Sequence, residues 1–234
     1  MKNPWEEIKK GKYVLSADQD RINKFNKTAA VEHQLQVELI PDPFFGNRKA
    51  KVVLLMLNPG FGSNELDNYK QNNFEEILLN NLKHSNSKNH FFSLDKTFHG
   101  TDAFKYWKPR VKELNEKGFD NDLLSERLFC INLFPYHSRK YRKISGELLK
   151  SQKYSLHLLD KAINEPNTII ISMRSFRLWE EAYLKIYDKA NSFEKLIRDG
   201  KMMRVKNYRN PTLSTANLGE KNFEKLIKKL KESL

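Results

Sequence analysis

Short apolar runs bounded by breakers predict the strands of a sheet. Three runs are rich in Val, Ile and Leu, and a weaker fourth follows late in the chain; they lie at 51–57, 127–134, 168–173 and 202–207. Strands that are apolar throughout are typical of a parallel sheet with both faces covered. The alternating stretch 34–40 predicts either an edge strand or the end of a helix.

Segments with helical periodicity lie between these runs. Apolar residues recur at three- and four-residue spacing in 103–117, 145–164, 174–190 and 216–230. Strands that alternate with helices predict βαβ crossovers. We therefore expect one α/β domain over residues 1–234, a three-layer sandwich with a central, mostly parallel four-stranded sheet and helices on both faces. The polar segment 64–98 predicts either a functional insertion or a poorly ordered loop.

The charge of the chain favours a polyanionic partner. The chain has 42 Lys and Arg against 29 Asp and Glu, which gives a formal net charge of +13. Such a charge attracts nucleic acid, because each neutralised phosphate releases counterions. A general preference for Lys on solvated helix faces would produce the same count, so charge alone leaves both interpretations open.

The single cysteine and the short apolar runs exclude several classes of protein. Cys130 has no partner for an intrachain disulfide and cannot hold a structural zinc or an iron–sulfur cluster by itself. The longest uninterrupted apolar run, 52–57, is far too short to cross a bilayer. His84, His90 and His99 lack pairing to Cys or clustered carboxylates. We expect a cytoplasmic monomer without membrane contact, metal or cofactor.

Three polar loops follow predicted strands and would meet at one edge of the sheet, where open α/β proteins bind ligands. Their sequences are Asn58-Pro59-Gly60-Phe61-Gly62, Asn132-Leu133-Phe134-Pro135-Tyr136-His137-Ser138-Arg139 and Asn210-Pro211-Thr212-Leu213-Ser214. Each loop alone is a weak signal, because Asn-Pro-Gly forms turns in many proteins and a buried Asn is usually structural. Their order and their common edge predict one site.

In this order the loops resemble the active-site motifs of the uracil-DNA glycosylase superfamily, closest to its mismatch-specific and single-strand-selective branches. The first is similar to the Asn-Pro-Gly motif after the first core strand, the second to the strand whose Asn reads the flipped pyrimidine, and the third to the last motif. Segment 41–47 resembles the approach loop of some members. The resemblance spans about residues 41 to 214 and implies a monofunctional DNA repair glycosylase that removes uracil or a related deaminated base.

The resemblance implies catalytic roles for Asn58 and Asn210. Asn58 would orient the attacking water, while Asn210 and the backbone amides near Gly60 would stabilise the departing uracil anion. Asn132 would read the base, accepting from N3–H and donating to O4, because an amide offers an acceptor and a donor side by side. The aromatic residues that could stack on the base are Phe61, Phe91 and Phe92.

Residues of the second and third loops would hold the DNA, single- or double-stranded. Leu213 is the predicted apolar wedge that fills the vacated base stack. The side chains predicted to contact phosphates are Ser138, Arg139, Arg142, Thr212 and Ser214. The basic run that contains the two arginines suits a rim that tracks phosphates, and an ordinary solvated loop is the alternative.

The chain departs from the family pattern at its catalytic positions. Asn58 replaces the Asp that serves as base in the most efficient branch, and Asn210 replaces the His of the last motif. We therefore expect slow turnover. A non-catalytic or repurposed nucleic-acid-binding member of the same fold is the alternative. An unrelated nucleotide enzyme is less favoured, because the first loop lacks the Lys-Ser/Thr pair of a P-loop.

Overall fold

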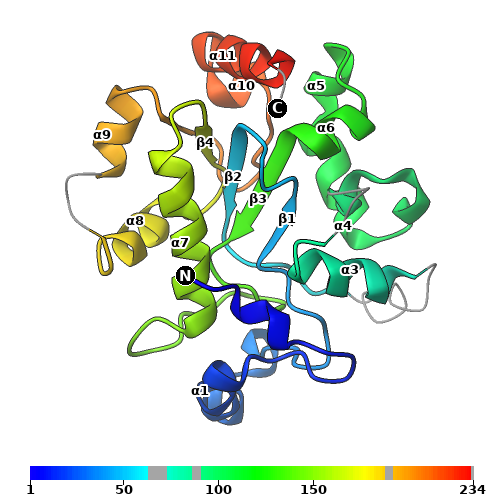
Figure 1. Ribbon diagram of the computed structural model, residues 1–234, viewed down its shortest axis with the longest axis vertical. Helices are drawn as coiled ribbons and strands as arrows, with labels where there is room; N and C mark the ends of the chain where they lie inside the picture. Colours follow the sequence, from blue (N-terminus) through cyan, green and yellow to red (C-terminus); the bar gives the residue numbers. More distant parts are fainter. Residues whose placement is uncertain (63–72, 86–90, 188–191, 233–234) are drawn as a thin grey trace.

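A five-stranded mixed sheet forms the centre of the protein (Figure 1), which confirms the α/β class. The computed structural model describes residues 1–62, 73–85, 91–187 and 192–232. The strand order is β1-β3-β2-β4-β5, with β1 antiparallel to β3 and the other pairs parallel. The strands are β1 (Phe44–Gly46), β2 (Val52–Met56), β3 (Leu128–Asn132), β4 (Ile169–Ser172) and β5 (Met202–Arg204).

The sheet differs from the prediction in its first strand. The four apolar runs form β2 to β5 as expected, but β1 lies in segment 41–47, where the sequence predicts a loop. β1 ends at Gly46 with a φ of 93°, and a Cβ at this position would lie 2.2 Å from the carbonyl oxygen of Leu128. A three-residue strand has no detectable period. The sheet is therefore mixed and five-stranded, and the predicted parallel core is one part of it.

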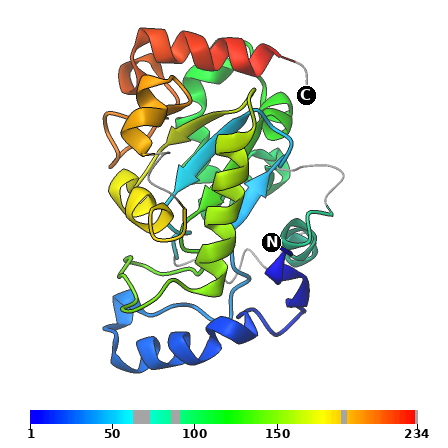
Figure 2. The same ribbon diagram turned by 60° about the vertical axis from the view of Figure 1, so that its left-hand side comes forward.

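Helices cover both faces of the sheet, as predicted. Neighbouring residues of a strand point to opposite faces, and Phe44 and Phe45 of β1 contact different helices. The Phe44 ring lies 6.1 Å from that of Tyr154 in α7 (Lys150–Asn164), and the Phe45 ring lies 5.7 Å from that of Trp107 in α4 (Asp102–Trp107). Figure 2 shows α7 crossing one face of the sheet.

All four predicted helical segments contain helix: 145–164 and the described part of 174–190 each form one shorter helix, and the other two segments are interrupted by backbone breakers. Segment 103–117 divides into α4, a 3₁₀ turn at Lys108–Arg110 and α5 (Lys112–Glu116), because Pro109 lacks an N–H. Segment 216–230 divides at Gly219, whose φ is 81°. The remaining helices are α1 (Ser16–Thr28), α3 (Phe74–Leu82), α6 (Asn121–Arg127), α8 (Phe176–Tyr183), α9 (Phe193–Arg198), α10 (Thr215–Leu218) and α11 (Glu220–Lys231).

Two further sequence expectations can be compared with the structure. Stretch 34–40 forms neither an edge strand nor a helix end, but a turn-containing loop after a 3₁₀ turn at Val31–His33. Segment 64–98 contains α3 and two 3₁₀ turns, at Phe92–Leu94 and Lys96–Phe98, while 63–72 and 86–90 lie outside the described residues. In the described parts of the chain, no helix has both the length and the apolar character needed to cross a membrane.

Asp18 joins α1 to α7 and to the second loop. Its carboxylate is fully buried and accepts hydrogen bonds from the Tyr136 hydroxyl at 2.9 Å and from the backbone N–H groups of Lys150 and Ser151 at 2.8 and 3.3 Å. Lys150 and Ser151 open α7, so a carboxylate from another helix caps the positive end of its dipole. This contact fixes where α1 lies relative to the loop that follows β3.

We expect Asp18→Ala to lower the free energy of unfolding by about 2–4 kcal/mol, because it leaves a buried hydroxyl and two helix N–H groups without an acceptor. Urea denaturation measures the effect. Asp20→Ala is the matched control, since Asp20 lies on the same helix and is exposed. Equal losses in the two variants would contradict the role assigned to the Asp18 contacts.

Candidate functional site

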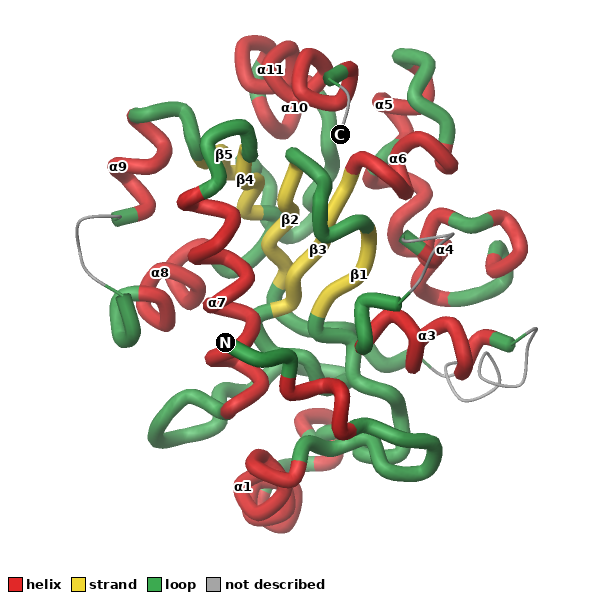
Figure 3. Tube along the Cα trace, in the orientation of Figure 1, coloured by secondary structure: helices red, strands yellow, loops and turns green. Residues whose placement is uncertain are grey.

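The carboxyl ends of β2, β3 and β4 open into a cavity of about 460 Å³. We call it the central cavity. Figure 3 shows the loops that gather below these strand ends. The central cavity brings together six of the residues predicted for the site: Asn58, Gly60, Phe61, Asn132, Ser138 and Arg139. Because the first two loops both contribute, the strand-end rule located this part of the site.

Asn58 links the first loop to the second. Its Nδ2 donates to the Ser138 hydroxyl at 3.2 Å and to the Pro59 carbonyl at 2.9 Å. These bonds orient the amide, so that its Oδ1 is the atom it can offer to a water molecule as an acceptor. Asn58 carries no titratable group, and a base for proton transfer has to come from another residue.

Asn132 is held in one orientation at the end of β3. Its side chain is 3% exposed, and its Nδ2 donates to the carbonyl oxygen of Asp42 at 2.6 Å. The Asn132 backbone N–H donates to Pro43 at 2.8 Å, so the same residue also holds the approach loop. One of its two amide N–H groups is thereby used, and the other and Oδ1 are the groups that a planar ligand can meet.

His137 lies buried between two loops that wall the cavity. Its Nδ1 is 2.7 Å from the Gly60 carbonyl oxygen and its Nε2 is 3.1 Å from that of Ile40. Burial lowers the pKa of His137, and the two hydrogen bonds oppose this shift in part. A neutral ring has one N–H and donates to one carbonyl at a time. The sequence placed His137 beside the second motif without assigning it this positioning role.

Two arginines of the cavity lining, Arg139 and Arg174, each lie near an aromatic ring of the same lining. The guanidinium of Arg139 lies 5.6 Å from the Phe61 ring centroid, and that of Arg174 lies 6.0 Å from the Tyr106 centroid. Arg174 also donates to the Arg209 carbonyl at 3.2 Å, which ties the loop after β5 to this lining. Arg174 lies two residues after the end of β4, so the strand-end rule that found the other loops also applied to it.

Two carboxylates, Asp42 and Asp102, line the same cavity. Asp102 opens α4, and a Cβ built on Gly62 would lie 1.8 Å from its Oδ2. Gly62 therefore allows the Asp102 carboxylate to lie against the backbone of the first loop. The sequence did not indicate Asp102, since it lies 40 positions from Gly62 and one residue before the predicted helix.

The third predicted loop lies outside the cavity lining, and its residues are occupied elsewhere. Leu213 is fully buried, so it is not available as the predicted wedge. The hydroxyls of Thr212 and Ser214 are 2.8 Å apart, and Asn217 Nδ2 donates to Thr212 at 3.0 Å. Asn210 is exposed and does not line the cavity. These contacts shape the start of α10, where an apolar side chain packs inward.

The three aromatic residues predicted as base-stacking candidates lie in two different places. Phe61 lines the cavity, whereas Phe91 and Phe92 are 0% and 2% exposed and pack against Phe45 at ring distances of 4.7 and 5.4 Å. Phe91 and Phe92 are therefore core residues, which corrects their prediction as base-stacking candidates. Arg142 is exposed and does not line the cavity. In the described part of the chain, no three His, Cys, Asp or Glu side chains are grouped to hold a metal ion.

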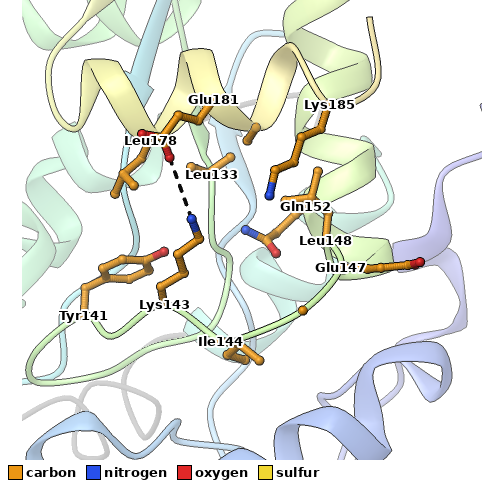
Figure 4. A pocket seen from close by; sticks show the side chains of 12 residues that line it. Leu133, Tyr141, Lys143, Ile144, Glu147, Leu148, Gln152, Leu178, Glu181 and Lys185 are labelled. Atoms are coloured by element: carbon orange, nitrogen blue, oxygen red, sulfur yellow. Dashed lines mark ion pairs between the residues drawn. The ribbon is translucent and has the colours of Figure 1, made fainter.

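A smaller hollow adjoins the central cavity and shares Tyr141 with it (Figure 4). Its volume is about 30 Å³, close to that of one water molecule. Lys143 and Glu181 form an ion pair at 3.7 Å across it. The hollow is too small for an organic ligand, so the central cavity is the stronger candidate site.

We expect the free energy of unfolding to fall as the pH drops below about 6.5, because unfolded His137 then takes up a proton that the buried native ring resists. The native pKa is lowered, so this stability is fully present above the unfolded value. His137→Gln should reduce the pH dependence measured by denaturation between pH 7.5 and 5.5. Some dependence remains, since burial lowers the pKa of His84 to about 4. Identical pH profiles would contradict the assignment.

Comparison of the chain with protein-family models, with curated proteins and with solved structures gave no match. The resemblance to the uracil-DNA glycosylase superfamily therefore stays a prediction that rests on short motifs and their order. Function has to be inferred from the chemistry of the residues around the central cavity.

Proposed function

We propose that the protein is a monofunctional DNA glycosylase that hydrolyses the N-glycosidic bond of uracil, or of a related deaminated base, flipped out of DNA. The observation that carries the proposal is the convergence of Asn58, Asn132 and Ser138 on one cavity of about 460 Å³. This volume lies within the range of small-molecule sites. A base inside a duplex has to leave the stack before its glycosidic carbon can be attacked.

Asn132 supplies the selectivity in this proposal. Its Oδ1 accepts from uracil N3–H, and the amide N–H that does not bond to Asp42 donates to O4. Cytosine presents an acceptor at N3 and a donor at the neighbouring position, so it would leave a buried polar group unpaired. Of the three aromatic candidates from the sequence, Phe61 is the one that lines the cavity, and we assign it the stacking role.

The chemistry is a displacement by water at C1′ of the sugar. The water oxygen forms a bond to C1′ while the C1′–N1 bond breaks. The electron pair of the C1′–N1 bond leaves with the base, which departs as an anion. Asn58 orients the water through Oδ1, and the Asp102 carboxylate accepts the proton that the water loses. The Asn132 amide and the backbone N–H groups near Gly60 stabilise the departing anion. Asn210 has no part in this scheme, since it lies outside the cavity lining.

A repurposed nucleic-acid-binding protein of the same architecture is the second candidate. The specific observation in its favour is the third loop, in which Asn210 is exposed and Leu213 is buried. A flipped base needs a side chain that fills its place in the stack. Tyr208, two residues before this loop, is 60% exposed, and its ring offers an aromatic surface to nucleic acid under either proposal.

The first test is cleavage of labelled oligonucleotides that carry uracil opposite A, opposite G and unpaired, with hypoxanthine and xanthine in parallel. Alkali converts abasic product into strand breaks. We expect Asn58→Ala to lower the rate by about 10²-fold or more, because the water loses its orienting acceptor. Asn210→Ala is the matched control and should stay within a few-fold of wild type.

Three outcomes of this assay have distinct meanings. The glycosylase proposal is supported if wild type and Asn210→Ala yield abasic product and Asn58→Ala does not. A loss in Asn210→Ala equal to that in Asn58→Ala would contradict the site as placed. No product from the wild-type protein, together with salt-sensitive DNA binding, would favour the repurposed binding protein.

We expect Asp102→Asn to lower kcat by about 10²–10⁴-fold with little change in KM, because it removes the proton acceptor and keeps the shape of the side chain. Single-turnover rates on the preferred oligonucleotide measure the effect. Asp42→Asn is the comparison, since Asp42 also lines the cavity. A loss confined to Asp42→Asn would transfer the role of base to Asp42, and full activity in Asp102→Asn would remove Asp102 from the mechanism.

A further inference from the structure

A second hollow, of about 350 Å³, lies between α1 and the loop that follows the second motif. We call it the α1 groove. Helix α1 provides one wall and residues 142–145 provide the other. Arg21 Nη2 donates to the Ser145 carbonyl at 2.7 Å, which joins the two walls. The Asp18 contacts hold α1 in place behind it.

The lining of the α1 groove contains four cationic side chains and no carboxylate, namely those of Arg21, Lys24, Arg142 and Lys143. Lys143 pairs with Glu181 at 3.7 Å, but both side chains are more than half exposed, so the pair is weak. The carboxylate of Asp18 on the same helix is buried and directed to Tyr136 and α7. The groove therefore presents a concentrated positive charge to solvent.

One loop connects this groove to the central cavity. Arg139 and Tyr141 line the cavity, and Arg142 to Ser145 line the groove. A strand whose base occupies the cavity would have its backbone at the cavity mouth. The loop then offers cations in succession along the path that leads away from the mouth. This succession suits a polymer that carries one charge per nucleotide.

We propose that the α1 groove binds the phosphate backbone of the nucleic-acid strand that flanks the central cavity. The choice of a nucleic-acid partner rests on the proposed function, but binding in the groove requires no catalysis. Arg21 and Arg142 provide guanidinium groups that can bind a phosphate through two N–H donors each. Phe25 and Ile144 in the same lining offer apolar surface to the sugars.

The test is the fluorescence anisotropy of labelled 20-nucleotide single and double strands that contain no uracil, titrated at several KCl concentrations. Substitution Arg21→Gln with Lys24→Gln should raise Kd about tenfold at 100 mM salt and reduce the slope of log K against log salt by about 1–2. The single variant Lys24→Gln keeps the test valid if the double variant misfolds, because Lys24 is exposed and lines the groove.

Lys27→Gln is the matched control. Lys27 lies on the same helix, is exposed, and lies outside the groove lining. A slope that drops in Lys24→Gln and stays unchanged in Lys27→Gln supports the proposal. An unchanged slope in the double variant, or equal drops in Lys24→Gln and Lys27→Gln, would overturn it.

Two further outcomes separate the proposals from each other. Inorganic phosphate is added at constant ionic strength, and the difference in Kd between wild type and the double variant should persist. If phosphate abolishes that difference, the groove is a small-anion site and the assignment to a polymer is overturned. If wild-type protein binds undamaged DNA through the groove but yields no abasic product, the glycosylase proposal is contradicted and the proposal of backbone binding in the groove is supported. Active protein with unaltered binding in the double variant would overturn the groove alone.

Discussion

The level carboxyl ends of three parallel strands are the constraint on which the candidate site depends. Met56 of β2 pairs with Asn132 of β3, and Leu55 pairs with Ser172 of β4. Because the parallel register aligns these strands, their carboxyl ends lie at the same edge of the sheet, and a loop begins at each of them. Backbone polar groups in such loops need partners, and the loops around the cavity find many of theirs in one another.

Buried polar side chains join these loops. Asn132 holds the approach loop through a carbonyl oxygen, His137 lies between the carbonyls of two segments, and Asn58 donates to Ser138. Each bond contributes about 0.5–1.5 kcal/mol net, but a buried polar group without its partner is less favourable by about 1–3 kcal/mol. The loops are therefore held in one arrangement before any ligand arrives. Preorganised donors and acceptors of this kind are what electrostatic catalysis requires.

The parts of this structure that the sequence predicts are those with a repeated physical signal. Continuous apolar runs reveal strands that are buried on both faces, and their ends locate Asn58 and Asn132. Helix α1 gives a weak signal, because Asp18 is one of only two of its residues that are fully buried. Asp102 reaches the cavity from a helix start outside every motif. Leu213 shows the limit of a motif, since an apolar loop residue is compatible with burial as well as exposure.

Under the proposed function, the central cavity and its surroundings would bind different parts of a nucleotide. The lining of the central cavity contains two carboxylates, Asp42 and Asp102, and two guanidinium groups, those of Arg139 and Arg174, so its formal charges balance and it suits a neutral base. A phosphate inside the cavity would be attracted by the two guanidinium groups and repelled by the two carboxylates, so the lining has no net formal charge that favours it. Beyond loop 139–145 the lining of the α1 groove is cationic. A nucleotide would therefore be oriented with its base inward and its phosphates outward, as attack at the glycosidic carbon requires.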